Sequence, residues 1–360
     1  MDKNNEMTEF QHPKPGSHGL ILGKFLPPHR GHLYLIEFAL QTVEALSVVV
    51  GSLKSEPMAG ELRVKMLQEI FPASVYPRLN ILHLTDENPQ YPHEDPNFWQ
   101  IWQQSLTGIL PQKPDWVFAS DDYGWKLAEV LGAQFMPVDP NRENFQISGT
   151  AIRENPHQHW DMLPPPVRRH FLKRVAVMGP ESTGKSTLAQ NLAKHFQGQW
   201  VPEYARTWIE SKGQRPVVSD MPPIARGQWA TQKAIEEQVL KQSEQGLIVY
   251  DTELWVTTIW NQVLFQHRDP EIEALAMRQH FDHYLLCVPD VPWVEDEVRY
   301  LPQGGEDFFE RCKHLLESQH LPYTLISGSW ENRMMTATAT VADLLKSALS
   351  PEIKSEAGPN

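Results

Sequence analysis

Two short segments of this 360-residue chain carry residues that could hold nucleotide phosphates. Residues 23–32 read GKFLPPHRGH, and residues 179–186 read GPESTGKS. Each segment follows a short apolar run and precedes a stretch with helical character. The free N–H groups and the positive dipole end of a helix N-terminus attract anions at such turns. Two segments of this kind, far apart in the sequence, predict two separate nucleotide sites.

The first segment combines two imidazoles with a glycine and a lysine. His29 and His32 are three residues apart and would lie on one face of the first helical turn. Gly31 lets a ligand approach the backbone closely, and Lys24 adds a positive charge. A surface or core histidine pair is the alternative, but the strand–turn–helix context favours a triphosphate site. The residues expected at ATP here are Gly23, Lys24, Phe25, His29, Gly31 and His32.

A second element of the first half, residues 147–153, reads ISGTAIR. Ser148 or Thr150 could cap a helix that begins here. Arg153 would then extend its guanidinium from the first helical turn toward the phosphates. A capped helix start is common by itself, so this interpretation depends on the histidine segment. Together, the two elements predict that Ser148, Thr150 and Arg153 contact ATP.

The second segment matches the P-loop pattern at every position. Its backbone N–H groups would cradle the β-phosphate of ATP, Lys185 would bridge the β- and γ-phosphates, and Ser186 would ligate Mg²⁺. The other residues expected to bind the nucleotide are Gly179, Glu181, Ser182, Thr183, Gly184 and Thr187.

Two carboxylates downstream of the P-loop are candidates for phosphate-transfer chemistry. Asp251 ends an apolar strand, and Glu203 follows the next apolar patch after the P-loop helix. We expect Glu203 to orient or activate a substrate hydroxyl, and Asp251 to serve the metal or act as the base. A surface carboxylate is the alternative for each. In the same segment as Glu203, we expect Tyr204 at the substrate and Arg206 at the nucleotide.

Residues 291–299 read VPWVEDEVR and follow an expected strand. Two interpretations stay open for this charged segment. It is either a lid that brings Arg299 onto the phosphates and Trp293 toward the substrate, or a solvated acidic face.

These motifs carry a family resemblance that covers about residues 18–330. The first half resembles the nucleotidyltransferase superfamily with an HxGH motif, and Lys24 with the following Pro-x-His is similar to nicotinamide-mononucleotide adenylyltransferases. The second half, through GPESTGKST, PEYAR, YDTE and PWVEDEVR, is similar to the ribosylnicotinamide kinase domain of NadR-type bifunctional proteins. Regulators of this type carry a helix-turn-helix domain before the first site, where this chain has only a short polar leader. A DNA-binding role is therefore not expected.

The resemblance implies two linked reactions that need ATP and Mg²⁺. The second domain would phosphorylate nicotinamide riboside to nicotinamide mononucleotide (NMN), and the first would adenylylate NMN to NAD with release of pyrophosphate. Because nicotinamide is a flat cation in NMN, Trp99 or Trp102 could stack on it, although both are equally typical of core aromatics. Asp121 could contact the ribose or adenine, or belong to a plain turn.

Two other functions remain as alternatives. Coenzyme A synthesis also pairs an adenylyltransferase with a P-loop kinase, but phosphopantetheine adenylyltransferases usually carry Thr at the position of His29. A module that senses NAD and ATP without turnover would keep both phosphate sites and need neither Glu203 nor Asp251.

Composition narrows the class of protein further. The net charge is −13, from 45 acidic and 32 basic side chains, which argues against nucleic-acid binding by bulk charge. The two cysteines, Cys287 and Cys312, are too few for a disulfide framework. The N-terminal residues lack a signal-peptide core, and no apolar stretch could cross a bilayer. We expect a cytoplasmic protein, and the sequence leaves open whether it forms a homo-oligomer.

The elements that must position these residues follow a βαβ rhythm, which predicts two doubly wound α/β domains with parallel sheets at residues 18–165 and 166–350. A Pro-rich stretch at 155–166 reads as a stiff connector. The N-terminal leader and the tail from about 351 look disordered. The expected strands are 18–22, 47–52, 79–84, 115–120, 134–138, 175–178, 246–250, 284–288 and 322–327. The expected helices are 31–46, 61–70, 98–110, 123–131, one from 150, 167–174 and 186–196.

Overall fold

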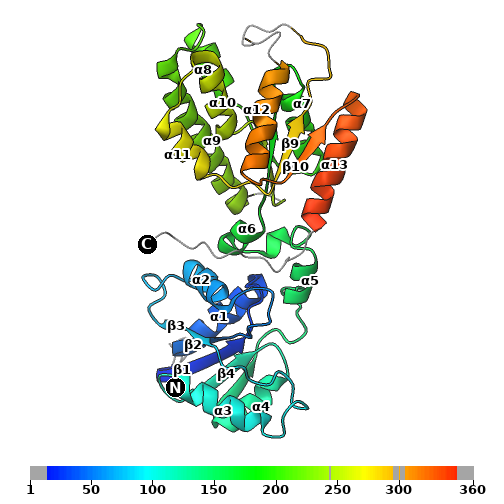
Figure 1. Ribbon diagram of the computed structural model, residues 1–360. Helices are drawn as coiled ribbons and strands as arrows, with labels where there is room; N and C mark the ends of the chain where they lie inside the picture. The colour runs from blue at the N-terminus through cyan, green and yellow to red at the C-terminus, as the bar shows by residue number, and fades with distance from the viewer. Residues whose placement is uncertain (1–13, 243–244, 295–299, 301–304, 347–360) are drawn as a thin grey trace, which may run out of the picture. The chain divides into compact units, whose positions relative to one another are not determined.

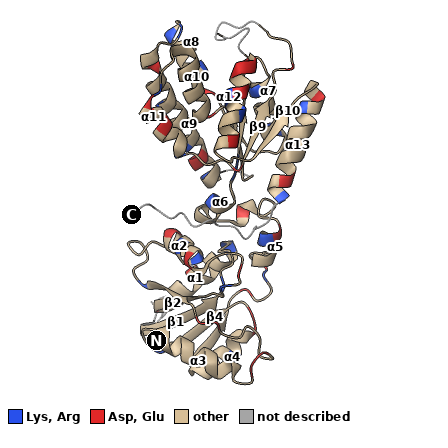
Figure 2. Cartoon of the chain, viewed as in Figure 1, with Lys and Arg blue, Asp and Glu red and all other residues tan. Residues whose placement is uncertain are grey.

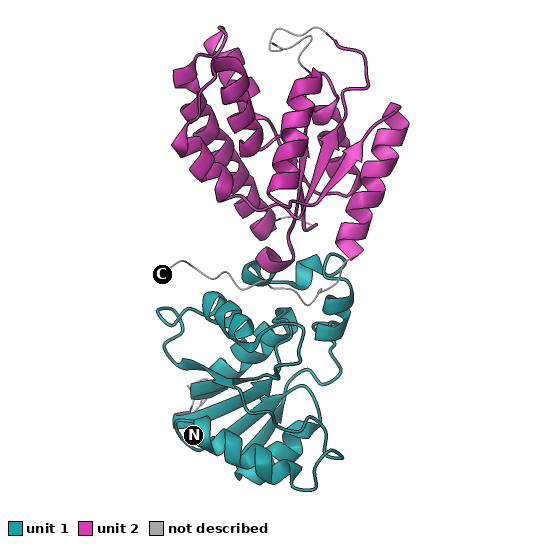
Figure 3. Cartoon of the chain, viewed as in Figure 1, with its two compact units in different colours: residues 1–167, 348–360 teal, residues 168–347 magenta. Residues whose placement is uncertain are grey.

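The structure, a computed structural model, describes residues 14–242, 245–294, 300 and 305–346. The chain divides into two compact units, which Figure 3 distinguishes by colour. Unit 1 ends at Val167 and unit 2 begins at Arg168. Each unit is described by itself below.

Unit 1 is a five-stranded parallel sheet with helices on both faces (Figure 1). The strand order is β3-β2-β1-β4-β5, so the chain changes direction across the sheet between β1 and β4. Loops leave the carboxyl ends of the strands at such a switch point and form a crevice suited to a ligand. The strands are β1 (Lys14–Gly23), β2 (Val43–Gly51), β3 (Leu79–Leu84), β4 (Trp116–Ala119) and β5 (Gln134–Pro137). The helices are α1 (Arg30–Thr42), α2 (Gly60–Ile70), α3 (Phe98–Ile109), α4 (Tyr123–Leu131) and α5 (Gly149–Glu154).

Successive residues of the central strands are buried on opposite faces of this sheet. Ile21 and Val48 pack in one apolar cluster with residues of α1 and α2. Leu20 and Val49 pack in another with residues of α3 and α4. Successive side chains of a strand point to opposite faces of the sheet. Because helices cover both faces here, residues of a central strand are buried on both faces, and the strand is a largely apolar run. Figure 2 shows few charged residues along the strands of either unit.

Unit 2 is also a five-stranded parallel sheet, in the order β10-β9-β6-β8-β7. The central strand β6 leads directly into the P-loop and then into α7. The strands are β6 (Lys173–Met178), β7 (Gln199–Val201), β8 (Leu247–Asp251), β9 (His283–Cys287) and β10 (Tyr323–Ile326). Helix α6 (Pro165–Phe171) spans the boundary between the units. The helices within unit 2 are α7 (Lys185–His195), α8 (Tyr204–Lys212), α9 (Met221–Gln242), α10 (Leu254–Phe265), α11 (Pro270–Met277), α12 (Gly305–Ser318) and α13 (Trp330–Lys346).

The two sheets confirm the expected α/β class with two doubly wound parallel sheets. Within the described part of the chain, no helix combines the length and apolarity needed to cross a membrane.

Several expected boundaries were wrong for reasons visible in the sheets. The helix expected at 31–46 ends at Thr42, because Val43 already pairs with β1 and is fully buried. β1 starts at Lys14, so residues 14–17 belong to a strand and not to a leader. The helix expected at 167–174 ends at Phe171, because the next residues start β6.

The stretch expected to be a stiff connector contains a short helical turn, Trp160–Met162, whose Trp160 is buried. It is thus partly packed rather than a bare linker. Helices α8 to α13 and strand β7 were not predicted. The remaining leader, residues 1–13, and the tail from 351 lie outside the described residues.

Candidate active sites

Unit 1 contains a cavity of about 720 Å³ at the carboxyl ends of its strands. Residues from β1, α1, α3, α5 and the loops between them form its wall. The cavity brings together every site residue that the sequence suggested for this half: Gly23, Lys24, Phe25, His29, Gly31, His32, Trp99, Trp102, Asp121, Ser148, Thr150 and Arg153.

The two histidines form a stacked pair at the start of α1. Their ring centroids are 3.7 Å apart, and His29 is the N-cap residue with an extended backbone. The Nδ1 atoms of both rings are buried and have no hydrogen-bond partner in the structure. Burial and the nearby Arg142 lower the pKa of His29 to about 4, and burial, His29 and Arg142 lower the pKa of His32 well below its usual value. Both rings are therefore neutral at pH 7 and can each donate one N–H.

Gly31 packs closely against this pair, and Gly149 packs closely against the loop that carries it. A Cβ on Gly31 would lie 3.2 Å from the His29 ring, and a Cβ on Gly149 would lie 2.6 Å from the carbonyl oxygen of Leu26. The first clash would displace the histidine, and the second would push α5 away from the loop that carries the histidines.

Arg153 ties α5 to that loop. Its guanidinium donates to the carbonyl oxygen of Leu26 at 2.6 Å and to Thr150 Oγ1 at 3.0 Å. Ser148 is the N-cap of α5, since its Oγ accepts from Ala151 N at 3.2 Å. Of the two cap candidates, the structure therefore selects Ser148. Arg153 lines the cavity, and its guanidinium is held in place there by the hydrogen bonds to Leu26 and Thr150.

Lys24, whose side chain is half exposed, is held by an ion pair to the buried carboxylate of Glu56. Its Nζ lies 3.0 Å from Glu56 Oε1, and Glu56 also pairs with the fully buried Arg63 at 2.6 Å. Arg63 donates in addition to the carbonyl oxygen of Lys24 at 2.7 Å. Sequence reasoning missed both Glu56 and Arg63, which position Lys24 from α2 and the preceding loop.

Arg142 is a further cation that sequence reasoning missed. It lines the cavity from the loop after β5, in a left-handed backbone conformation with φ 54°. Its guanidinium lies 3.5 Å from Asp121, and Asp139 holds the loop by accepting from Glu143 N at 2.8 Å. No periodic pattern marks this loop, so only its charge could have suggested it.

The two tryptophans of α3 serve the core and the cavity at once. Both pack against the apolar cluster on the α3 side of the sheet, and both line the cavity. Trp102 Nε1 donates to the carbonyl oxygen of Pro89 at 2.9 Å, which fixes the ring. The two interpretations made from the sequence are thus compatible.

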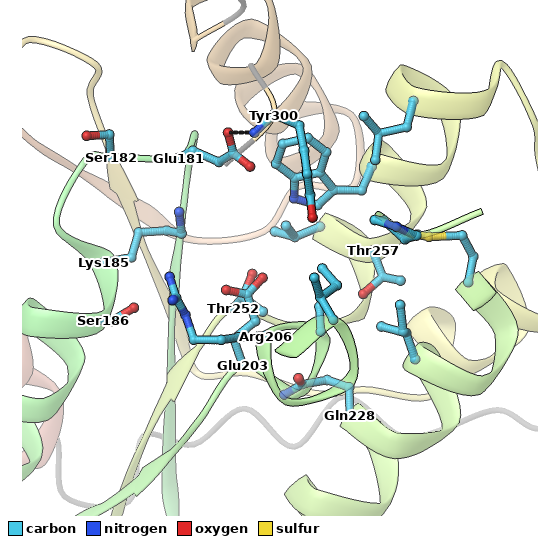
Figure 4. A pocket seen from close by; sticks show the side chains of 18 of the residues that line it. Glu181, Ser182, Lys185, Ser186, Glu203, Arg206, Gln228, Thr252, Thr257 and Tyr300 are labelled. Carbon is cyan, nitrogen blue, oxygen red and sulfur yellow. Dashed lines mark hydrogen bonds between the residues drawn. The ribbon is translucent and has the colours of Figure 1, made fainter. Parts of the chain in front are cut away.

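Unit 2 contains a smaller cavity of about 160 Å³ beside the P-loop (Figure 4). Figure 4 shows Lys185, Glu203 and Arg206 together at one end of it. Its lining includes the following expected residues: Glu181, Ser182, Gly184, Lys185, Ser186, Thr187, Glu203 and Arg206. Gly179, Thr183, Asp251, Tyr204 and Trp293 do not line it, and Arg299 lies outside the described residues.

Contacts of three P-loop residues fix the shape of the loop. Gly179 has φ 136°, and a Cβ there would lie 2.7 Å from the carbonyl oxygen of Cys287. The buried Thr183 donates to the carbonyl oxygen of Pro180 at 2.8 Å. Lys185 Nζ donates to that same oxygen at 2.7 Å, which holds the ammonium over the loop.

Glu203 and Asp251 form a carboxylate pair at the ends of β7 and β8. Burial, with the charge of Asp251 adding to it, raises the pKa of Glu203 to about 7. Burial also raises the pKa of Asp251, while hydrogen bonding from Ser186 and the charge of Lys185 oppose the rise. Asp251 Oδ1 is buried and has no hydrogen-bond partner. The pair can thus accept a proton near neutral pH.

Two side chains of the P-loop accept backbone hydrogen bonds from the expected lid segment and from the residue that follows it. Ser182 Oγ accepts from Val294 N at 2.8 Å, and Glu181 accepts from Tyr300 N at 2.8 Å. Tyr300, the residue after this segment, lines the cavity, whereas the expected Trp293 does not.

Two further cavity residues come from helices that the sequence did not reveal. Trp260 lines the cavity from α10, and Gln228 from α9. Gln228 Oε1 accepts from Tyr204 N at 2.7 Å, and Tyr204 packs its ring against Gly227 of α9. Tyr204 therefore joins α8 to α9 instead of facing the cavity. An aromatic on the cavity face of α10 could have been found only if that helix had been predicted.

The residues present suit Mg²⁺ bound together with a nucleotide. Among the described residues, no group of three or more His, Cys, Asp or Glu side chains could hold a metal alone. Mg²⁺ usually takes one or two protein oxygens and completes its shell with phosphates and water. Ser186 and the unpartnered oxygen of Asp251 provide such a partial site.

Family models match both units. Residues 20–155 match the cytidylyltransferase-like family, and residues 174–333 match an AAA domain. The solved structure of NadR protein in complex with NAD and AMP-PNP aligns with a TM-score of 0.65 at 22% identity, over 91% of this chain and 96% of that chain. This similarity shows the shared fold.

Curated relatives extend the match to the whole sequence. The trifunctional NAD biosynthesis/regulator protein NadR of Salmonella typhimurium is 30% identical over 351 residues, covering 91% of this chain and 83% of the relative. The protein of the same name from Escherichia coli is 27% identical over the same length. A nicotinamide-nucleotide adenylyltransferase of Aeropyrum pernix is 33% identical over 164 residues, 42% of this chain and 88% of the relative. The resemblance seen in the motifs is confirmed, and the chain belongs to the NadR family.

Proposed function

We propose that this chain is a bifunctional enzyme of NAD salvage. Unit 2 phosphorylates nicotinamide riboside with ATP and forms NMN. Unit 1 joins NMN to the adenylyl group of a second ATP, forming NAD and pyrophosphate. The order is chemically consistent, because the phosphate added in the first reaction is the nucleophile of the second. The observation that carries the proposal is that each unit has its own phosphate-binding cavity with side chains suited to one of these reactions.

In unit 1, a phosphate oxygen of NMN attacks the α-phosphorus of ATP in line, and the bond to pyrophosphate breaks. The nucleophile is already an anion, so no general base is required. Catalysis then depends on position and on charge neutralisation. His29 and His32 donate N–H groups to the phosphates, and Lys24, Arg142 and Arg153 supply positive charge around the cavity.

In unit 2, the primary hydroxyl of the riboside attacks the γ-phosphorus of ATP, and ADP leaves. Glu203 takes the hydroxyl proton, since its raised pKa of about 7 suits a base at neutral pH. Lys185 and Arg206 balance the charge of the transferred phosphoryl group. Mg²⁺, held by Ser186 and Asp251, would neutralise charge on the β- and γ-phosphates.

The nicotinamide ring needs a flat, electron-rich wall in the kinase cavity. Trp260 and Tyr300 both line that cavity and provide aromatic faces for the cationic ring. In unit 1 the same role falls to Trp99 or Trp102. The proposal includes a cytoplasmic location, which two buried, free cysteines support.

Product analysis tests the whole proposal. Incubation with nicotinamide riboside and ATP should give NMN first and then NAD, with one ADP for each riboside phosphorylated and one pyrophosphate for each NAD formed. NMN with ATP should give NAD without ADP. Turnover of phosphopantetheine with ATP in place of both pyridine substrates would favour the coenzyme A alternative. Binding of NAD and ATP with no product from any pair would favour the sensing module.

A further inference from the structure

Trp330, the first residue of α13, is a large aromatic side chain exposed beside the P-loop. It keeps 59% of its surface exposed. A Cβ built on Gly184 would lie only 2.9 Å from Trp330 Cη2, so the indole lies directly against the backbone that starts α7. Trp330 does not line the 160 Å³ cavity, and neither proposed reaction uses it.

A buried arginine fixes this indole. Arg333, on the same helix, is 2% exposed and its guanidinium carbon lies 5.6 Å from the centroid of the Trp330 ring. It donates to the carbonyl oxygens of Gly328 at 3.0 Å, Val288 at 2.8 Å and Thr183 at 3.4 Å. It also pairs with Asp290. One guanidinium thus joins the P-loop, the end of β9 and the loop after β10, and the indole rests on a rigid support.

The position of the indole relative to the P-loop is informative. The residues suited to phosphoryl transfer, Glu203 and Arg206, lie in the cavity on one side of the loop. Helix α13 packs against α7 and β10 and brings Trp330 to the loop outside that cavity. A nucleotide held by the loop must direct its terminal phosphate toward the cavity. Its nucleoside end must therefore extend away from the cavity, along the surface where Trp330 is exposed.

We propose that Trp330 is the stacking platform for the base of the nucleotide bound at the P-loop. This inference rests on the proposed kinase function for the identity of the donor. The ligand it would take is a purine nucleoside di- or triphosphate. Because every base has a π face, stacking alone discriminates little between bases. We therefore expect the kinase to use GTP and ATP with similar kcat/KM.

The test compares Trp330→Ala with Trp330→Phe in the kinase reaction of the full chain. Loss of the stack should raise the KM for ATP about tenfold, with a smaller change in kcat and in the KM for the riboside. Phenylalanine should restore most of the affinity. Inorganic tripolyphosphate, which has the phosphates without a base, should inhibit wild type and both variants equally, whereas inhibition by ADP should weaken only in the alanine variant.

Two control substitutions separate stacking from general damage. Met335→Ala removes an exposed side chain from the same helix, and Trp125→Ala removes an exposed indole from unit 1. Neither residue lines either of the two cavities described above, and neither change should alter the KM for ATP.

The outcomes distinguish this inference from the proposed function. An unchanged KM for ATP in an active Trp330→Ala variant would overturn the platform and leave the kinase intact. Equal weakening of ADP and tripolyphosphate would also overturn it, because the indole would then only support the loop. If wild type makes no NMN, the proposed kinase function fails. In that case, the affinities of wild type and Trp330→Ala for ADP and for tripolyphosphate, measured by calorimetry, still decide the role of Trp330.

Discussion

The two cavities, both of which we propose to bind ATP, differ in the charges of the side chains that line them. Unit 1 lines its cavity with three cations and two neutral imidazoles. Asp86, Asp121 and Asp139 also line it, and of these Asp121 pairs with Arg142 and Asp139 accepts from backbone amides. Unit 2 places a carboxylate pair beside its lysine and arginine. The difference follows the nucleophile: a phosphate anion needs only position and charge, whereas a hydroxyl must lose a proton.

Burial produces both behaviours by the same physical cause. Removal from water disfavours the charged form of any group, so it lowers the pKa of a histidine and raises that of a carboxylic acid. In unit 1 this keeps His29 neutral, with a pKa of about 4. In unit 2 it brings Glu203 to about 7. One desolvation effect thus prepares hydrogen-bond donors in one unit and a proton acceptor in the other.

The largest expected effect is a clean separation of the two activities by single substitutions. Lys185→Ala should lower the kinase kcat/KM on the order of 10³-fold, because the ammonium over the P-loop is lost. His29→Ala should do the same to adenylyl transfer. Each variant should keep the other activity within about twofold, measured with nicotinamide riboside or NMN as substrate. Loss of both activities in a folded single variant would mean that the sites are not separate.

The next effect concerns the base, and the pH profile tests it. If Glu203 must be ionised, the kinase kcat/KM should fall about tenfold per unit below pH 7, since the pKa of the free enzyme is about 7. Adenylyl transfer should show no such limb. Glu203→Gln should lower the kinase rate about 10²-fold or more and remove the limb. A kinase profile that is flat from pH 5.5 to 8 would assign the base role elsewhere, with Asp251 as the first candidate.

A smaller effect should appear in the stability of unit 1. The folded pKa of His29 is about 4 against an ordinary 6.5, so the unfolded chain binds the proton more tightly. Stability is therefore lost as pH falls from 6.5 toward 4, and His29 accounts for about 2 kcal/mol between pH 7 and 5. His29→Gln should be less sensitive to this change. The free energy of unfolding of unit 1 can be measured at each pH by urea denaturation, with hydrogen exchange of α1 as the probe. An identical pH dependence in wild type and His29→Gln would contradict the prediction.

The smallest expected effect sharpens the description of the unit 1 cavity. Arg142→Ala should raise the KM for ATP in adenylyl transfer about tenfold, because one charged contact to phosphate is removed. The kinase KM for ATP should not change. Lys126→Ala is the matched control, since Lys126 pairs with Glu129 on α4 and does not line the cavity. If both substitutions act equally, Arg142 contributes only general positive charge.

The sequence was a good guide wherever a residue's role is set by its near neighbours. β6 and β8 were found within a few residues, because strands buried on both faces are short apolar runs bounded by turns. The glycines of the two phosphate-binding turns were recognisable because they lie at fixed spacings from the histidines and from Lys185. Helices α8 to α13 were missed. The apolar stripes of α9, α10 and α11 are weak, whereas α12 is as amphipathic as α3 and α4, which were predicted, so its pattern could have been found.

The sequence by itself determined the two phosphate-binding turns, the parallel α/β class and the identity of the histidines and the P-loop lysine, because each depends on residues within one strand–turn–helix unit. Only the tertiary structure decided which distant side chains join them. Arg142, Trp260, Tyr300 and Trp330 come from loops or helices that are remote in the sequence. The physical reason is that parallel strands bring all their carboxyl ends to one edge of a sheet. The strand order, fixed by packing of the whole unit, then selects which loops meet there.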